Sequence, residues 1–333
     1  MFIIFLTLIV GINIVLYLNN NSIAKYFSLY DKPDKVRKFH QESVPITGGI
    51  FIFINIFFYI IFQIFFFENT FFFNNLNILI IFFVFCSLFF LLGILDDKFL
   101  FNPNLKFFLI FIFIIIILFL DKSLIIKNVN LRFANFYLNI FSIPWTALCF
   151  LLFINAFNMF DGLNLQNSTY TIFLLFILLF ESQFNNMIIF IFIGVILFSI
   201  LNKNNKSFLG DSGTYLLSFV IGYLFIKLYN ENQIRFADQI VLAMIIPGID
   251  LMRLFIQRIF IYKRSPFSPD RLHLHHYFLD KFGQKKTLLY INLLIIMPYV
   301  VANYFENFFI FIFFQLFIYL AILLSLQKKK NKL

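Results

Sequence analysis

Charged residues are scarce in this sequence of 333 amino acids: they make up 13% of it, whereas hydrophobic residues make up 62%. Ordinary soluble domains carry roughly 25% charged residues. The mean hydropathy is correspondingly high, at +0.91. These values exclude an ordinary soluble domain and predict a polytopic integral membrane protein. The net charge of +10 fits membrane topology better than nucleic-acid binding, so we expect no nucleic-acid partner.

Cysteine is also rare, and the two residues, Cys86 and Cys149, both lie in apolar runs, so no disulfide is implied. Residues 1–18 are apolar but lack the basic start and the small-residue cleavage site of a secretory signal peptide. We therefore expect a retained first membrane helix. Internal repeats are not recognisable, which favours a single transmembrane domain over residues 1–333.

Long hydrophobic runs are what the sequence has in abundance. A membrane-spanning helix needs about 20 apolar residues. This rule predicts an all-α protein with about eleven transmembrane helices. The predicted helices lie near 1–18, 46–67, 77–95, 105–120, 138–157, 168–181, 186–201, 211–229, 238–257, 286–303 and 307–326.

The lysine and arginine residues set the orientation, because loops on the cytoplasmic side carry most of them. With the N-terminus outside and the C-terminus inside, most of the 26 basic residues fall in inside segments. The outside loops then hold four: Lys122, Lys127, Arg132 and Arg235. The longest of those loops, 121–137, has the alternation of a small β-hairpin.

The second inside loop begins with two adjacent acids, Asp96 and Asp97, which close the apolar run 78–95. Ionised groups are costly in lipid, so acids at a helix end face water, a partner or a cation. Adjacent carboxylates suit Mg²⁺, which prefers oxygen ligands. The alternative is a pair of solvated acids where the helix leaves the bilayer. Lys106 follows an Asn-Pro-Asn turn, 102–104, that would fold its ammonium group back toward the acids.

The third inside loop carries two amides three residues apart, Asn155 and Asn158, which share a helix face. They are followed by Asp161, Gly162 and Asn164, and this loop has no lysine or arginine, so topology does not account for it. The amides could simply cap neighbouring helices. The acid and the further amide favour metal and nucleotide contacts instead.

The first and fourth inside loops each hold one candidate residue. His40, beside Arg37 and Lys38, is suited to phosphate, although the basic residues also serve as a membrane anchor. Asp211 lies between glycines at the start of a predicted helix. An acid there is often only a cap. Free N–H groups at a helix start also favour phosphate or a metal-bound anion.

The fifth inside loop contains Arg271, His273, His275 and His276. Three histidines suggest zinc, but no cysteine is near and the spacing is not that of a helical HExxH site. Arginine supplies paired donors to phosphate, and histidine supplies further donors. We therefore favour a pyrophosphate clamp over a metal site.

Taken in order, these clusters resemble the polyprenyl-phosphate N-acetylhexosamine-1-phosphate transferase superfamily, glycosyltransferase family 4. The His-x-His-His segment is closer to its WecA-like branch than to MraY. The resemblance spans roughly residues 35–280. The matching pieces are His40…Pro45…Gly48-Gly49, Gly93…Asp96-Asp97, Asn155-Ala156-Phe157-Asn158-Met159…Asp161-Gly162, Phe208…Gly210-Asp211-Ser212-Gly213 and Ser265-Pro266-Phe267…Pro269-Asp270-Arg271…His273…His275-His276.

The resemblance implies transfer of a sugar-1-phosphate from a UDP-sugar to undecaprenyl phosphate, which gives a polyprenyl-diphospho-sugar and UMP and initiates cell-envelope glycan synthesis. It implies Mg²⁺, with Mn²⁺ as the alternative ion, held by Asn158 and Asp211. It also implies a multi-pass protein of the inner (plasma) membrane with its active site facing the cytoplasm, in a family whose members are often homodimers. Carried over by motif, the catalytic acids are Asp96, Asp97 and Asp161, and the substrate-binding residues are His40, Lys106, Asn155, Asn164, Arg271, His273, His275 and His276.

One departure from the family pattern concerns the third loop. Most bacterial members read Asp-Gly-x-Asp-Gly-Leu, whereas this chain reads Asp161-Gly162-Leu163-Asn164-Leu165-Gln166. Asn164 thus replaces an acid, and the following glycine is missing. This change keeps open an inactive homologue that only binds lipid-linked sugar. A membrane transporter is the remaining alternative, although transport sites tend to lie near the bilayer midplane.

Overall fold

The fold is a bundle of long helices with two small two-stranded sheets. The computed structural model describes residues 2–33, 42–66, 72–268 and 270–330. The helices are α1 Phe2–Leu18, α2 Asn20–Phe27, α3 Gly48–Phe65, α4 Leu76–Phe99, α5 Pro103–Leu120, α6 Ser142–Phe160, α7 Gln166–Glu181, α8 Asn186–Lys203, α9 Gly210–Asn230, α10 Ala237–Ile256, α11 Leu274–Tyr304 and α12 Phe308–Lys330, with short turns η1 Lys122–Leu124, η2 Asn139–Phe141 and η3 Gln257–Ile261. The strands are β1 Tyr30–Asp31, β2 Val44–Pro45, β3 Asn128–Leu131 and β4 Ala134–Tyr137.

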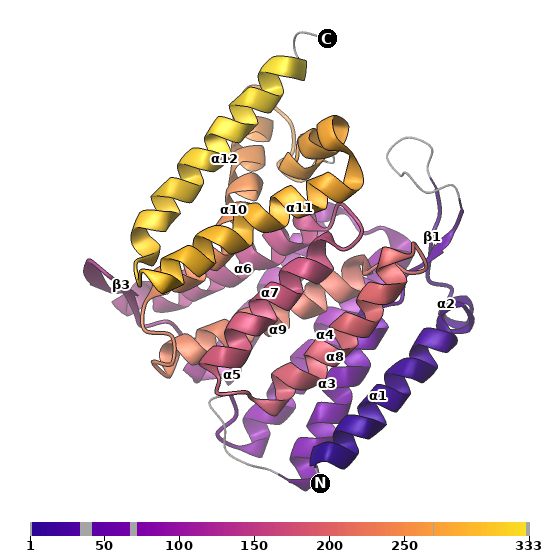
Figure 1. Ribbon diagram of the computed structural model, residues 1–333. Coiled ribbons are helices and arrows are strands. Elements are labelled where there is room, and N and C mark those ends of the chain that lie inside the picture. The colour runs from indigo at the N-terminus through magenta and orange to yellow at the C-terminus, as the bar shows by residue number, and fades with distance from the viewer. Residues whose placement is uncertain (1, 34–41, 67–71, 269, 331–333) are drawn as a thin grey trace.

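The helices are those of a polytopic membrane protein. Within the described residues, nine are long and apolar enough to cross a membrane, and α1 with α2, bent by 71°, would make a tenth. Each of the eleven ranges predicted from the sequence overlaps α1 or one of α3 to α12. The predicted range 168–181 corresponds to α7, which has 16 residues and is shorter than every other helix that overlaps a predicted range. Figure 1 shows α1 starting and α12 ending at opposite ends of the bundle.

Helix α9 is the centre of the bundle and contacts α3, α4, α6 and α7 (Figure 1). Every residue of α9 from Ser212 to Tyr229 is buried inside the protein. This burial explains why the helix tolerates polar residues that a lipid-facing helix would not. Its most extensive contact is with α4, where a Cβ atom at Gly93 would overlap the backbone of Ser212. Glycine therefore lets the acidic end of α4 lie directly against the first turn of α9.

Two buried polar pairs join helices away from that end. Asn13 of α1 and Asn55 of α3, both fully buried, exchange amide hydrogen bonds of 3.0 and 2.9 Å. Lys227, near the end of α9, forms an ion pair of 2.9 Å with the equally buried Asp121. The hydroxyl of Tyr223 also donates to Asp121. Because polar groups without partners are costly in an apolar interior, each pair fixes its helices in one register.

The expected hairpin in the loop 121–137 is present, since β3 pairs with β4 in antiparallel register. The hydroxyl of Tyr229 accepts from the backbone N–H of Asn130, so the hairpin is tied to the end of α9. The backbone N–H of Arg132 donates to Asp238, which ties the hairpin to α10 as well.

Helix α11 begins twelve residues before its predicted start at 286. Its first part, 274–282, is too polar for a hydrophobicity rule to detect, and a break at Gly283 with a φ of +74° separates it from the apolar part. A residue in this left-handed region is tolerated best as glycine. The break lets the first turns of α11 leave the helix axis and lie beside the pocket described below.

The contact at Gly93 gives a matched test of helix packing. Gly93→Ala should lower the midpoint of thermal unfolding of the detergent-purified protein, because overpacking of this kind costs about 1–3 kcal/mol. Gly248→Ala is the control, because Gly248 also lies inside a helix but has open space around its Cβ position. The control should be neutral or stabilising by up to about 1 kcal/mol. Equal behaviour of the two variants would show that α4 and α9 do not approach as described.

Candidate active site

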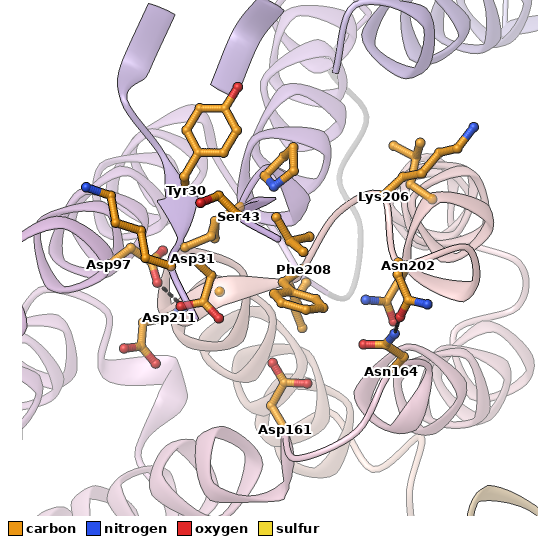
Figure 2. Close-up of a pocket in the computed structure, with 18 of the residues that line it drawn as sticks. Tyr30, Asp31, Ser43, Asp97, Asp161, Asn164, Asn202, Lys206, Phe208 and Asp211 are labelled. Atoms are coloured by element: carbon orange, nitrogen blue, oxygen red, sulfur yellow. Dashed lines mark hydrogen bonds between the residues drawn. The ribbon is translucent and has the colours of Figure 1, made fainter. Parts of the chain in front are cut away.

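One large pocket, of about 2000 Å³, lies at the end of the bundle where the predicted inside loops meet. All five of those loops contribute lining residues, although they are far apart in the sequence. Six of the sequence-predicted site residues line the pocket: Asp97, Asn158, Asp161, Asn164, Asp211 and His276. Figure 2 shows Asp97 beside Asp211 on the left of the view, Asn164 beside Asn202 on the right, and Asp161 below and between these two pairs.

Asp97, near the end of α4, caps the N-terminus of α9. Its two carboxylate oxygens accept hydrogen bonds from the backbone N–H groups of Asp211 (2.8 Å) and Ser212 (3.1 Å). The residue at the N-cap position, Leu209, has no side chain that could do this. The first N–H groups of a helix lack internal partners, and a carboxylate satisfies both their hydrogen bonds and the helix dipole. Gly210, with a φ of +73°, makes the tight entry that brings these N–H groups to Asp97.

Asp211 is held with its carboxylate toward the pocket. The amide of Asn158 on α6 donates to it over 2.6 Å and donates also to Thr214 over 2.9 Å. The ammonium group of Lys106 lies 3.9 Å from the other carboxylate oxygen. Asn158 and Asp211, which the sequence assigned jointly to a metal, are therefore in direct contact across α6 and α9.

Asp96 is fully buried and has a different role from its neighbour. Adjacent helical residues point about 100° apart, so the two acids cannot face the same way. The carboxylate of Asp96 forms an ion pair of 2.7 Å with Lys106. It also accepts from the hydroxyl of Tyr215 and from the backbone N–H of Phe101. Lys106 folds back over the turn at 102–104, as expected. Its ammonium group lies between the carboxylates of Asp96 and Asp211.

Asp161 follows α6, and its side chain opens into the pocket. The side chain is exposed to the pocket, and the protein atoms around it together with the negative charge of Asp97 raise the pKa of Asp161 to about 7. A carboxyl group that titrates near neutral pH in a cleft is typical of functional sites. Such a group can accept a proton under physiological conditions, and a nearby cation would favour its charged form.

The histidine segment is less exposed to the pocket than the sequence suggests. Only His276 lines it, while the ring of His275 is buried against Gly162 and His273 is buried beside Asp250. Arg271 is not among the lining residues, and its guanidinium lies 3.7 Å from Asp280. The structure therefore brings one histidine to the pocket and stacks the other two behind it.

The remaining predicted site residues are Asn155, Asn164 and His40. Asn155 donates to the carbonyl of Leu151 in its own helix and does not line the pocket. Asn164 lines the pocket and donates to Asn205. The residue after it, Leu165, has a φ of +68°, a left-handed conformation that glycine adopts more readily than leucine. His40 lies outside the described residues.

Sequence reasoning missed the polar run at the end of α8. Asn202 accepts from the backbone N–H of Leu165 over 2.6 Å and donates to the carbonyl of Ser207 over 2.9 Å. Asn202 and Asn205 both line the pocket. The available signal was a cluster of amides directly after an apolar helix. The neighbouring lysines, Lys203 and Lys206, make the same segment look like an ordinary membrane anchor.

The donor groups fit a magnesium ion bound together with phosphates. Among the described residues, no group of three or more His, Cys, Asp or Glu has the arrangement of a closed metal site. Mg²⁺ usually keeps several waters and takes one or two carboxylates plus substrate phosphates. The carboxylate of Asp211 and the amide of Asn158 provide such a partial, oxygen-rich site, with Asp161 also facing the pocket.

Comparison with known proteins gives one family. Residues 79–229, which include Asp97, Asp161 and Asp211 of the pocket, match glycosyl transferase family 4. A Thermotoga maritima protein named undecaprenyl-phosphate alpha-N-acetylglucosaminyl 1-phosphate transferase is 30% identical over 268 residues, which is 80% of this chain and 78% of the relative. Proteins of the same name from Salmonella typhi and Escherichia coli (strain K12) are 27% identical over 76% of this chain and 70% of their own lengths.

The Asp96–Lys106 pair can be tested without an activity assay. Lys106→Met should destabilise the purified protein by about 3 kcal/mol, because removal of one partner leaves a buried carboxylate uncompensated. Asp96→Asn combined with Lys106→Met should recover part of this loss. Lys203→Met, which removes an exposed lysine at the end of α8, serves as the control and should leave the thermal midpoint unchanged. A Lys106→Met midpoint equal to that of the control would contradict the ion pair.

Proposed function

This chain belongs to glycosyl transferase family 4, and from that membership we propose that it transfers a sugar-1-phosphate to undecaprenyl phosphate. The observation that carries the proposal is the meeting of five separated loops around one pocket that contains Asp97, Asp161 and Asp211. The relatives named for this reaction align over more than two thirds of their own lengths. The transporter alternative is not favoured, because the polar lining residues gather at one end of the bundle.

The donor in this proposal is a UDP-N-acetylhexosamine, and the products are UMP and a polyprenyl-diphospho-sugar. The pocket volume of about 2000 Å³ leaves room for a nucleotide sugar and for the phosphate of the lipid acceptor together. A long isoprenoid acceptor also explains why the site is built at the end of a membrane bundle.

We propose that Asp211 and Asn158 hold Mg²⁺, which would neutralise charge on the donor diphosphate when bound. Lys106, already between Asp96 and Asp211, adds a fixed positive charge on the same side. His276 faces the pocket and can donate to a phosphate oxygen. Phosphoryl transfer depends mainly on this kind of positioning and charge stabilisation.

The transfer in this proposal is a single displacement by the lipid phosphate. Both oxygens of Asp97 are engaged by the backbone of α9, and Asp96 is fully buried, so neither carboxylate is suited to act as a nucleophile. Asp161, with its pKa near 7, is the group suited to take a proton from the acceptor phosphate. Trapping of a phosphorylated Asp96 or Asp97 would contradict this mechanism.

We also propose that the pocket faces the cytoplasm and that the protein lies in the inner membrane. The support is the distribution of lysine and arginine, which are most frequent in the loops at the pocket end. A homodimer, expected from the family resemblance, is retained as a prediction.

The function is tested by an assay of membranes that contain the protein. Labelled UDP-N-acetylglucosamine, Mg²⁺ and undecaprenyl phosphate should yield a labelled lipid, and EDTA should abolish its formation. Asp211→Asn should lower the rate about 100-fold or more, since it removes the charge of the metal ligand. Glu231→Gln, which changes an exposed acid at the far end of α9, should retain full activity. If the protein binds lipid-linked sugar but transfers no sugar-1-phosphate from any UDP-sugar, the result would support the inactive homologue instead.

The raised pKa of Asp161 predicts a pH dependence. The pKa of this carboxyl group is about 7 without a metal, and a bound cation lowers it, so the rate should fall as the pH decreases through a pKa at or below 7, where the group becomes protonated and cannot accept a proton. Asp161→Asn should be slow at every pH and should lose the part of the profile that this carboxyl group contributes. The pH dependence that remains in Asp161→Asn should follow the second pKa of the acceptor phosphate, which is about 6. An unchanged profile in Asp161→Asn would rule out this role.

A further inference from the structure

The start of α11 is held by a residue from another helix. His273 occupies the N-cap position but makes no capping hydrogen bond from its own side chain. The carboxylate of Asp250 on α10 accepts instead from the backbone N–H of Leu274, the first residue of α11, at 3.3 Å from each oxygen. A carboxylate at this position also opposes the positive end of the helix dipole. The first turn of α11, which carries His275 and His276, is thus oriented by α10.

Asp250 also fixes the ring of His273. Its second oxygen lies 3.0 Å from the Nδ1 atom of that ring. A carboxylate in this position only accepts, so Nδ1 must carry the proton. Asp250 itself is 5% exposed and does not line the pocket, which separates it from residues that touch substrate.

The carboxylate of Asp250 is positioned in turn by α10 and α12. The hydroxyl of Tyr319 on α12, fully buried, donates to it over 2.8 Å. Arg253 donates to the same oxygen over 2.8 Å, to the Tyr319 hydroxyl over 2.8 Å and to the carbonyl of Leu272 over 2.6 Å. With so many partners, Asp250 has one orientation, and the backbone on both sides of His273 is tied to it.

The contacts continue from His273 to the pocket. The rings of His273 and His275 are stacked, with centroids 5.2 Å apart and planes 13° apart. The ring of His275 packs against Gly162, where a Cβ atom would overlap it, and Gly162 follows Asp161. His276, in contact with His275 at 4.3 Å between centroids, faces the pocket.

We propose that Asp250 is the positioning residue of the histidine segment. It caps α11 and holds His273 as the Nδ1-protonated ring, and the stacked rings then place His275 on Gly162 and His276 in the pocket. Tyr319 links the C-terminal helix to the same carboxylate, so α12 takes part in shaping the site. The arrangement of His273 stands on the geometry alone, whereas its effect on catalysis rests on the proposed function.

The first test observes the histidine rings directly. The chain has only four histidines, so ring-¹⁵N-labelled histidine in the detergent-purified protein gives a sparse NMR spectrum, and His273→Gln assigns the signal of His273. The proton of His273 should be on Nδ1, and Asp250→Asn should shift this signal. A proton on Nε2 alone, or a signal unmoved by Asp250→Asn, would overturn the proposal whether or not the protein is a transferase.

Tyr319→Phe provides a milder variant in case Asp250→Asn does not fold. It should move the His273 signals, because it removes one donor from the carboxylate. Tyr170→Phe is the matched control, since Tyr170 is equally buried and its hydroxyl also bonds to α10, but to the carbonyl of Ala243. The control should leave the His273 signals in place. Equal shifts in both variants would overturn the link through Tyr319.

The second test separates positioning from stability in the transferase assay. Tyr319→Phe should raise the KM for the nucleotide sugar about tenfold, because the pocket histidine is misplaced, and should leave the KM for the polyprenyl phosphate unchanged. A loss of folded protein would lower the maximal rate without changing either KM. Tyr170→Phe should keep both constants. An unchanged KM for the nucleotide sugar in Tyr319→Phe would reject the catalytic part of the proposal and leave the ring assignment to the NMR result.

Discussion

The interaction on which the site depends is the contact between the carboxylate of Asp97 and the first backbone N–H groups of α9. Every residue of α9 from Ser212 to Tyr229 is buried, and the helix contacts α3, α4, α6 and α7, so the position of its start helps to set the positions of the helices around it. The contact requires α4 and α9 to approach closely, and Gly93 permits this. Because the same first turn carries Asp211, the packing of the bundle and the geometry of the pocket are set by one constraint.

A second helix of the pocket starts in the same manner. Asp250 of α10 caps α11, just as Asp97 of α4 caps α9. In both cases the helix that receives the carboxylate has no capping side chain of its own. A capping carboxylate that comes from another helix fixes the orientation of the capped turn relative to that helix. A capping side chain from the same segment cannot do this. This arrangement suits a site in which separated loops must present charged groups to one ligand.

Two further polar pairs lie in the interior away from the pocket. Asn13 pairs with Asn55, and Lys227 pairs with Asp121 at the opposite end of α9 from the pocket. These pairs resemble the Asp96–Lys106 pair in that both members would be costly if left alone. The difference is that Lys106 also lies 3.9 Å from Asp211, which lines the pocket, whereas the other two pairs lie away from the pocket.

The sequence by itself determined the helical class, the approximate helix ranges and the hairpin, because long apolar runs and strand alternation are local signals. It also determined which loops would carry the polar clusters, and the folding back of Lys106, because a proline turn acts within a few residues. Only the tertiary structure decided that Asp96 is buried while Asp97 caps α9, that His273 and His275 lie behind the pocket, and that α11 begins at Leu274. Those outcomes depend on carboxylates supplied by distant helices, and spacing along one segment contains no information about which distant group will satisfy its free N–H groups.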